Sequence, residues 1–186
     1  DAADVIFVEQ REQLGTGHAV LQAREAFPDE DGTILILCGD VPLLRRATVE
    51  ALVTRHIATG AAVTVMTTRL ADPGHYGRVV TDDRGEVLKI VEARDATPGE
   101  REIREINTGI YCVEGRFLFE AVAGIGNDNA QGEYYLTDIV EMACRRGLPV
   151  RSYAAEDPEE VMGINTPEEL DRACRIKEAE MQRDAE

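Results

Sequence analysis

Cysteine is sparse in this sequence, and its copies stand far apart. The four residues Cys38, Cys112, Cys144 and Cys174 form no Cys-x-x-Cys pair and no His/Cys cluster. Zinc sites and disulfide frameworks in small proteins need such clustered ligands. The spacing therefore argues against both, and it indicates free thiols and a cytoplasmic location.

Basic residues are in short supply as well. The 20 Lys and Arg residues face 36 Asp and Glu residues, which gives a formal net charge of −16. This balance argues against non-specific binding to nucleic acid and against an anionic membrane surface as partner. A phosphorylated substrate would need a local basic loop or a metal ion to hold it.

Long apolar runs and a start signal are also lacking. No apolar stretch approaches the length of a membrane span, and the N-terminus is acidic rather than signal-like. The sequence has no initiator Met and begins next to a strand pattern at residues 5–9. We therefore expect a piece of a larger protein.

What remains is an ordinary globular composition with 44% hydrophobic residues and no tryptophan, long enough for one domain with a substantial core. Strand signals alternate with helix signals, and a hairpin interrupts the alternation. We expect strands at 5–9, 33–38, 62–68, 77–81, 86–92, 106–113 and 150–153, and helices at 16–26, 47–59, 117–122, 135–144 and from 167 onward. The pattern predicts a Rossmann-like α/β fold with three αβα layers, a mostly parallel sheet and a small hairpin lobe.

The strand at 33–38 runs directly into Gly39 and Asp40, and Pro42 prevents its extension. A short continuous apolar run of this kind is typical of a buried parallel strand. Ligands of open α/β sheets lie outside the carboxyl ends of such strands, where a carboxylate can hold Mg²⁺. From this segment alone two interpretations stay open: Asp40 is a metal ligand, or it belongs to a simple Asx turn.

Two further loops carry polar groups before a helix. Residues 10–19 hold two glycines and a threonine, with Thr16 as the expected N-cap, and the planar amide of Gln10 can pair with a nucleobase edge. We interpret His18 as structural, because no second His or Cys lies at metal spacing. Residues 129–138 form a polar, aromatic segment that leads into a helix, and a simple capping segment is the alternative interpretation.

Three strand residues complete the candidates. Gly77 opens the hairpin and permits the close approach of a sugar, although a turn glycine would look the same. Glu92 ends the second hairpin strand, where an outward solvated Glu is the alternative. Asn107 begins an apolar strand, and a buried Asn there would need partners such as a ligand hydroxyl.

Taken in order, these segments resemble the uridylyltransferase domain of bacterial bifunctional N-acetylglucosamine-1-phosphate uridylyltransferase/glucosamine-1-phosphate acetyltransferases, over nearly the whole chain. The strings that carry the resemblance are QLGTGHA at 13–19, GDVPL at 39–43, YGRV at 76–79, IVE at 90–92, EINTGI at 105–110 and NAQGEYYLTD at 129–138. The last two are close to diagnostic of the family.

The resemblance implies a role for each matching position. The expected substrate-binding residues are Gln10, Gly15, Thr16, Cys38, Gly39, Asp40, Gly77, Glu92, Asn107, Thr137 and Asn165. Within this set the resemblance implies that Gln10, Gly15 and Thr16 read uracil, and that Asp40 and Asn165 bind Mg²⁺. Mg²⁺ takes one or two protein oxygens and keeps waters and phosphates for the rest, which suits one carboxylate and one amide.

The implied reaction is the attack of N-acetylglucosamine 1-phosphate on the α-phosphorus of UTP, which gives UDP-N-acetylglucosamine and pyrophosphate. Residues 1–165 would form this domain and residues 166–186 a linker helix. Two alternatives remain, namely another sugar nucleotidyltransferase and a non-catalytic nucleotide-sugar-binding module.

The sequence departs from the family pattern in three ways. It contains no match to the family's N-terminal Gly-rich loop with its Arg and Lys, so we expect no catalytic residue in these 186 residues and only weak activity. It also contains no match to the left-handed β-helix through which family members trimerise and transfer acetyl groups. Cys38 stands where many relatives carry Tyr. If the sheet lacks its first strands, we also expect an exposed apolar edge.

Overall fold

The computed structural model describes residues 5–28 and 31–183. The elements follow in the order α1 (Thr16–Gln22), η1 (Arg24–Ala26), β1 (Thr33–Ile36), α2 (Arg46–Thr59), β2 (Val63–Arg69), β3 (Arg78–Thr81), β4 (Val87–Val91), α3 (Pro98–Arg101), β5 (Glu105–Glu114), α4 (Gly115–Val122), α5 (Asp138–Arg145), β6 (Val150–Ala154), η2 (Pro158–Val161) and α6 (Pro167–Arg183). None of the helices in the described residues is long and apolar enough to cross a membrane.

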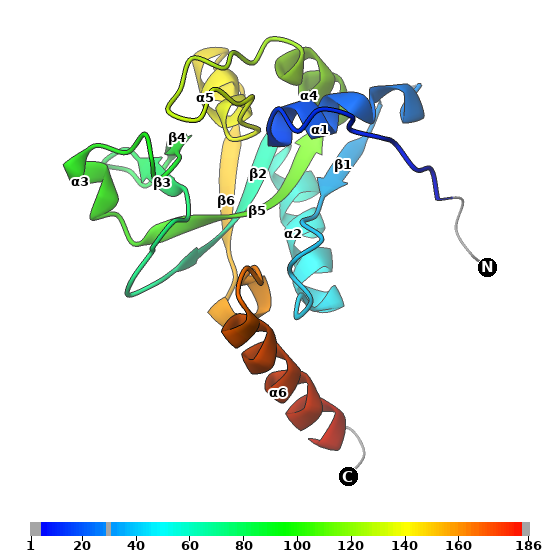
Figure 1. Ribbon diagram of the computed structural model, residues 1–186. Helices are drawn as coiled ribbons and strands as arrows, with labels where there is room; N and C mark the ends of the chain where they lie inside the picture. Colours follow the sequence, from blue (N-terminus) through cyan, green and yellow to red (C-terminus); the bar gives the residue numbers. More distant parts are fainter. Residues whose placement is uncertain (1–4, 29–30, 184–186) are drawn as a thin grey trace.

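The strands form one mixed sheet around β5, the longest of them (Figure 1). One edge of β5 pairs with β2, which pairs in turn with β6. The other edge pairs with β1 and, nearer the start of β5, with β3 of the β3–β4 hairpin. The hairpin and the short helix α3 form the small lobe at the left of Figure 1, so the predicted hairpin is confirmed.

The α/β architecture is as expected, but the mostly parallel sheet is not. Among the described strands only the β2–β6 pairing is parallel, and the other pairings are antiparallel. The reason is the insertion of β5, which runs opposite to β1 and β2 and separates them. β1 is also less buried than predicted. Its residues are half-buried or exposed, because among the described strands it pairs only with β5.

The predicted three layers are confirmed by the two faces of the sheet. On one face Val65 and Tyr111 pack against α4 and α5 in the larger core. On the other face Ile110 and Cys112 pack with Leu52 of α2 in a smaller core. The alternation of side chains along a strand sends neighbouring residues to opposite layers, so the central strands are buried on both sides.

The strand predicted at residues 5–9 is wrong. Val5, Ile6 and Phe7 are 68%, 65% and 92% exposed and belong to no strand. Strand pairing needs a neighbouring edge that accepts the backbone hydrogen bonds, and here the segment lies outside the sheet as it leads to α1 (Figure 1).

The helix starts differ in how far they follow local capping signals. Gly15 rather than Thr16 is the N-cap of α1, and the helix predicted from residue 135 begins at Asp138. At α6 the prediction is confirmed: Thr166 accepts from the N–H of Glu169 at 3.2 Å, and Pro167 is the first helical residue. Pro suits this position because its missing N–H would have no partner inside the helix.

Candidate active site

Asp40 and Asn165 lie beside each other although 125 positions separate them in the sequence. A Cβ atom placed on Gly163 would lie 2.9 Å from Asp40 Oδ2 and 3.5 Å from Asn165 Nδ2. Asp40 follows β1, and Asn165 follows β6 and η2. Both side chains are exposed, so an oxygen of each can reach a ligand from solvent.

The backbone of residues 163–166 is fixed by four consecutive hydrogen bonds. Their N–H groups donate, in order, to the hydroxyl of Tyr76 at 3.2 Å, to the carbonyl of Asp40 at 2.9 Å, and twice to the carboxylate of Glu169 at 2.7 and 2.9 Å. The bond from Asn165 N–H is the main reason why the pKa of Glu169 lies below its ordinary value. The segment that carries Asn165 is thereby held against the loop that carries Asp40.

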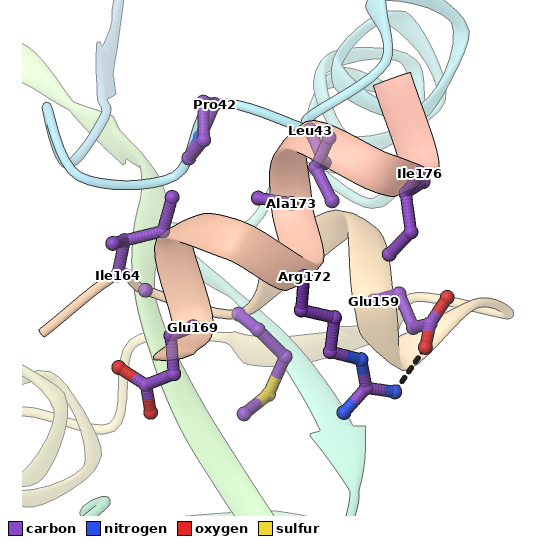
Figure 2. A pocket seen from close by; sticks show the side chains of 10 residues that line it. Pro42, Leu43, Glu159, Ile164, Glu169, Arg172, Ala173 and Ile176 are labelled. Atoms are coloured by element: carbon purple, nitrogen blue, oxygen red, sulfur yellow. Dashed lines mark hydrogen bonds and ion pairs between the residues drawn. The ribbon is translucent and has the colours of Figure 1, made fainter. Parts of the chain in front are cut away.

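A small apolar cavity of about 100 Å³ lies behind this segment (Figure 2). Pro42 and Leu43 line it from the loop after Asp40, and Ala173 and Ile176 line it from α6. The first turns of α6 therefore share packing partners with the loop that carries Asp40.

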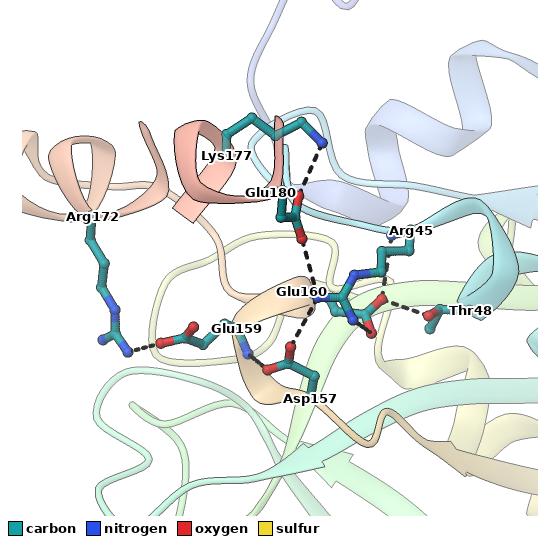
Figure 3. Close-up of polar contacts among 8 residues, drawn as sticks. All are labelled: Arg45, Thr48, Asp157, Glu159, Glu160, Arg172, Lys177 and Glu180. Carbon is teal, nitrogen blue, oxygen red and sulfur yellow. Dashed lines mark hydrogen bonds and ion pairs between the residues drawn. The ribbon is translucent and has the colours of Figure 1, made fainter. Parts of the chain in front are cut away.

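An ion-pair network anchors η2, which leads into the same segment (Figure 3). The carboxylate of Glu160 is buried and accepts from Thr48 Oγ1 at 2.5 Å and from Arg45 Nη1 at 3.2 Å. Arg45 also pairs with Glu180 of α6 at 3.2 Å. Through these contacts η2, the start of α2 and α6 hold one another in place.

A second cavity, of about 250 Å³, adjoins the end of β1. Its polar lining comes from segments far apart in the sequence, and the residues from the predicted set are Thr16, Cys38, Glu92, Asn107 and Thr137. Its apolar wall includes Ile36 and Leu136. A cavity with a few converging polar groups on an apolar wall is typical of a small-molecule site.

Glu92 and Thr137 form the polar floor of this cavity. Thr137 Oγ1 donates to Glu92 Oε1 at 3.1 Å. Burial, followed by the nearby charge of Asp95, raises the pKa of Glu92 above its ordinary value, although the bond from Thr137 opposes the shift. Gly77 completes this side, because a Cβ there would lie 3.4 Å from Glu92 Oε2. Glu92 is thus half-buried and bonded to Thr137, and it is not the outward, solvated side chain of the alternative interpretation.

Asn107 is buried at the start of β5, where its side chain needs hydrogen-bond partners. The side-chain oxygen of Asn107 accepts from the backbone N–H of Gly109 at 3.0 Å. The backbone N–H of Asn107 donates to the carbonyl of Gly77 at 2.9 Å. Gly109 has a φ of +78°, and a Cβ there would lie 2.6 Å from Cys38 Sγ. Cys38, whose pKa is raised mainly by burial, thus lies directly against the strand that carries Asn107.

The start of α1 approaches the same cavity through Thr16. Thr16 Oγ1 accepts from the N–H of Leu136 at 3.0 Å, which joins this loop to the segment before α5. Gly15 has a φ of +110°, and a Cβ there would lie 2.7 Å from the carbonyl oxygen of Tyr134, so only glycine fits. Gln10 donates from Nε2 to the carbonyl of Gly15 at 3.1 Å.

The structure therefore brings the predicted residues together in three adjoining groups. Asp40 and Asn165 form the first group, with Gly39 next to Asp40 in open space. The second group lies around the cavity and comprises Cys38, Gly77, Glu92, Asn107 and Thr137. The third group lies at and just before the start of α1 and comprises Gln10, Gly15 and Thr16.

Three further residues of the site were not in the predicted set, namely Tyr76, Gly109 and Gly163. Tyr76 and Gly109 lie within the strings at 76–79 and 105–110, and Gly163 lies two residues before Asn165. Their sequence contexts alone did not distinguish them from turn residues. In the part of the chain that the structure describes, no group of three or more His, Cys, Asp or Glu side chains could hold a metal ion.

In open α/β sheets, ligands bind outside the carboxyl ends of the strands, and Asp40 follows the carboxyl end of β1. The sequence model of the nucleotidyl transferase family matches residues 3–158. The chain therefore belongs to the nucleotidyl transferase family.

Several curated relatives are similar over nearly the whole chain. The bifunctional protein GlmU of Geobacter metallireducens is 54% identical over 97% of this chain and 38% of its own length. The bifunctional protein GlmU of Geobacter sulfurreducens is 55% identical over 93% of this chain and 36% of its own length. The chain thus spans less than two fifths of these two relatives.

Among solved structures, the fold is similar to that of a UDP-glucose pyrophosphorylase complexed with UDP-glucose. The TM-score is 0.62, and the match covers 80% of this chain and 58% of the other at 15% sequence identity. At this identity the likeness supports the nucleotidyltransferase fold and nothing finer.

Proposed function

We propose that the chain is the uridylyltransferase part of a bifunctional enzyme, which transfers UMP from UTP to N-acetylglucosamine 1-phosphate. The products would be UDP-N-acetylglucosamine and pyrophosphate. The observation that carries the proposal is the meeting of Asp40 and Asn165 beside the cavity lined by Glu92, Asn107 and Thr137. The relatives' identity of more than 50% supports it.

The two exposed groups fit a hard divalent cation, and we propose Mg²⁺. One carboxylate oxygen of Asp40 and the amide oxygen of Asn165 would bind it, which is the small number of protein ligands that Mg²⁺ accepts beside phosphates and water. When bound, the ion would supply positive charge to the phosphate oxygens.

The protein's own residues would orient the two substrates. Glu92 and Asn107 offer a carboxylate and an amide to the hydroxyl and acetamido groups of the sugar, and Gly77 leaves room for its close approach. Gln10, Gly15 and Thr16 lie on the side where the base of the nucleotide would bind. In the reaction a phosphate oxygen of the sugar phosphate forms a bond to the α-phosphorus of UTP, and the bond to pyrophosphate breaks. Positioning of this kind supplies much of the rate in phosphoryl-type transfer.

Titration calorimetry with UDP-N-acetylglucosamine tests the proposal. Binding is the primary readout, since turnover by these 186 residues alone is expected to be slow. We expect binding that weakens at least about tenfold in Asn107→Ala, because a buried amide that pairs with the ligand is lost. Asn127→Ala is the matched control, since Asn127 is exposed and its side chain donates to the carbonyl of Gly132 outside the candidate site.

The same titrations, together with an assay of pyrophosphate release, separate the alternatives. Tighter binding of a thymidine or guanosine diphosphate sugar would replace the uridylyl assignment by another sugar nucleotidyltransferase. Product binding without any release of pyrophosphate from UTP, even at high protein concentration, would favour a nucleotide-sugar-binding module.

A further inference from the structure

His18 lies beside Gln10 rather than serving only as a structural residue of α1. Gln10 Nε2 is 3.0 Å from His18 Nδ1 and donates to the carbonyl of Gly15 at 3.1 Å. The atom that faces the carbonyl must be the amide nitrogen, because two oxygens at this distance would repel each other. The orientation of the Gln10 amide is therefore fixed by its surroundings.

This orientation uses both N–H groups of the Gln10 amide. A primary amide has two donors, and here one goes to the Gly15 carbonyl and the other to the ring of His18. His18 Nδ1 must then act as an acceptor, so the neutral ring carries its proton on Nε2. The side-chain oxygen of Gln10 makes no hydrogen bond within the described residues.

On the other side of the ring, Gln22 lies 3.2 Å from His18 Nε2. A neutral imidazole has one acceptor nitrogen, and Gln10 at the shorter distance takes it. Gln22 Nε2 also lies 3.2 Å from the backbone carbonyl of His18, so Gln22 can accept from Nε2–H only by turning its amide and giving up that bond. Gln10 keeps both of its contacts when Nδ1 is the acceptor, and both of its distances are shorter, at 3.0 and 3.1 Å. Gln22 does not touch Gln10 in any of these contacts.

We infer that His18 is a positioning residue for base selection: together with the Gly15 carbonyl it occupies both N–H groups of Gln10, so that only an oxygen faces the nucleotide. The inference rests on the proposed function, which places the base at Gln10. Uracil carries an N–H at ring position 3 that can donate to this oxygen. Cytosine carries an acceptor nitrogen there, which would face the oxygen without a proton between them.

Without the His18 acceptor, the amide of Gln10 would be held by one contact instead of two. It could then turn and offer an N–H to cytosine at the cost of a single hydrogen bond. Binding sites built on fixed donors and acceptors discriminate strongly, because the wrong ligand leaves a buried polar group unpaired. The discrimination between the two pyrimidines should therefore depend on His18, while the affinity for the sugar should not.

The test measures the competition of UDP and CDP against UDP-N-acetylglucosamine. We expect the wild-type chain to prefer UDP by about 100-fold or more, and His18→Ala to reduce this preference to about tenfold or less. His18→Asn should keep most of it, because the Asn side-chain oxygen can occupy the position of Nδ1. Gln22→Ala is the matched control on the far side of the ring and should leave the preference unchanged.

A second readout needs no nucleotide. In ¹⁵N NMR spectra of the free protein, we expect His18 to show the tautomer with its proton on Nε2 and an acceptor at Nδ1. A proton on Nδ1, or a UDP preference that survives in His18→Ala, would overturn the inference while the proposed function stands. Equal binding of UDP and CDP by the wild type would overturn both.

Discussion

The hydroxyl of Tyr76 accepts a hydrogen bond of 3.2 Å from the backbone N–H of Gly163, across 87 positions of sequence. Tyr76 belongs to the loop that leads into β3 and to the sugar side of the site, whereas Gly163 lies next to Asn165 and faces Asp40. The bond thus joins the part of the site proposed for the sugar to the part proposed for the metal ion.

Replacing Tyr76 by Phe should weaken the binding of a divalent cation while leaving the fold intact. The change removes the acceptor for Gly163 N–H, and one hydrogen bond contributes about 1 kcal/mol, or roughly a fivefold change in affinity. Electron paramagnetic resonance with Mn²⁺ as the probe measures this affinity directly. Tyr153→Phe on β6 is the matched control, because the Tyr153 hydroxyl makes no hydrogen bond within the described residues, and an equal loss in both variants would contradict the role of Tyr76.

Gly163→Ala should act on the same site by steric overlap. The added Cβ would lie 2.9 Å from Asp40 Oδ2, which is too close, so the carboxylate has to move. Disturbing the groups around a metal ligand typically costs about 10- to 100-fold in affinity, and we expect Mn²⁺ binding to weaken by at least about tenfold. In Gly99→Ala the new methyl group meets no atom within 4 Å, so this control should bind Mn²⁺ as the wild type does.

The sequence predicted the order of the elements well, because strong local signals mark them. The apolar β-branched run of β2 and the Thr166–Pro167 start of α6 lie where the patterns placed them. Strand pairing could not be predicted in the same way. The position of β5 between β1 and β2 depends on contacts between distant segments, and the continuous apolar run 5–8 carries no information about whether a sheet edge will accept it.

The candidate site shows the same division. Asp40 and Asn107 were predicted from their residue types and the strings around them, and Asn165 from the resemblance to the family. The contacts of His18 with Gln10 and of Tyr76 with Gly163 depend on side-chain directions that no spacing rule gives, so His18, Tyr76 and Gly163 were assigned no role in the site.

Glu92→Gln should change how stability depends on pH. Burial raises the pKa of Glu92 in the folded state, so the folded protein holds this proton at pH values where the unfolded chain has lost it. The wild type therefore loses stability from this group as the pH rises from the ordinary glutamate pKa through the raised one. The amide of the variant has no such proton, but its oxygen still accepts from Thr137. Urea unfolding between about pH 4 and pH 7 should show the variant gaining stability relative to the wild type as the pH rises, and a constant difference would contradict the shift.

Hydrogen exchange should separate the two neighbours of β5. β1 has half-buried or exposed residues and pairs on one side only among the described strands, whereas β2 is buried along nearly its whole length between β5 and β6. The fraction of time an amide is open falls exponentially as the local free energy of unfolding rises, so the amides of β1 should exchange at least about tenfold faster than those of β2. Mass spectrometry of overlapping peptides measures both strands in one experiment, and equal protection would show that β1 is covered by further contacts.

Glu160→Gln should destabilise the whole domain. The Glu160 side chain is 6% exposed and accepts from Thr48 Oγ1, Arg45 Nη1 and the Arg45 backbone N–H, so an amide nitrogen in place of one oxygen would face a donor instead. The Arg45 side chain is 50% exposed and can turn to water, which limits the cost to about 2 kcal/mol in urea unfolding. Glu159→Gln is the matched control, because Glu159 pairs with Arg172 at the surface (Figure 3) and such pairs contribute at most about 1 kcal/mol. The network would not anchor η2 if the two variants unfolded at the same urea concentration.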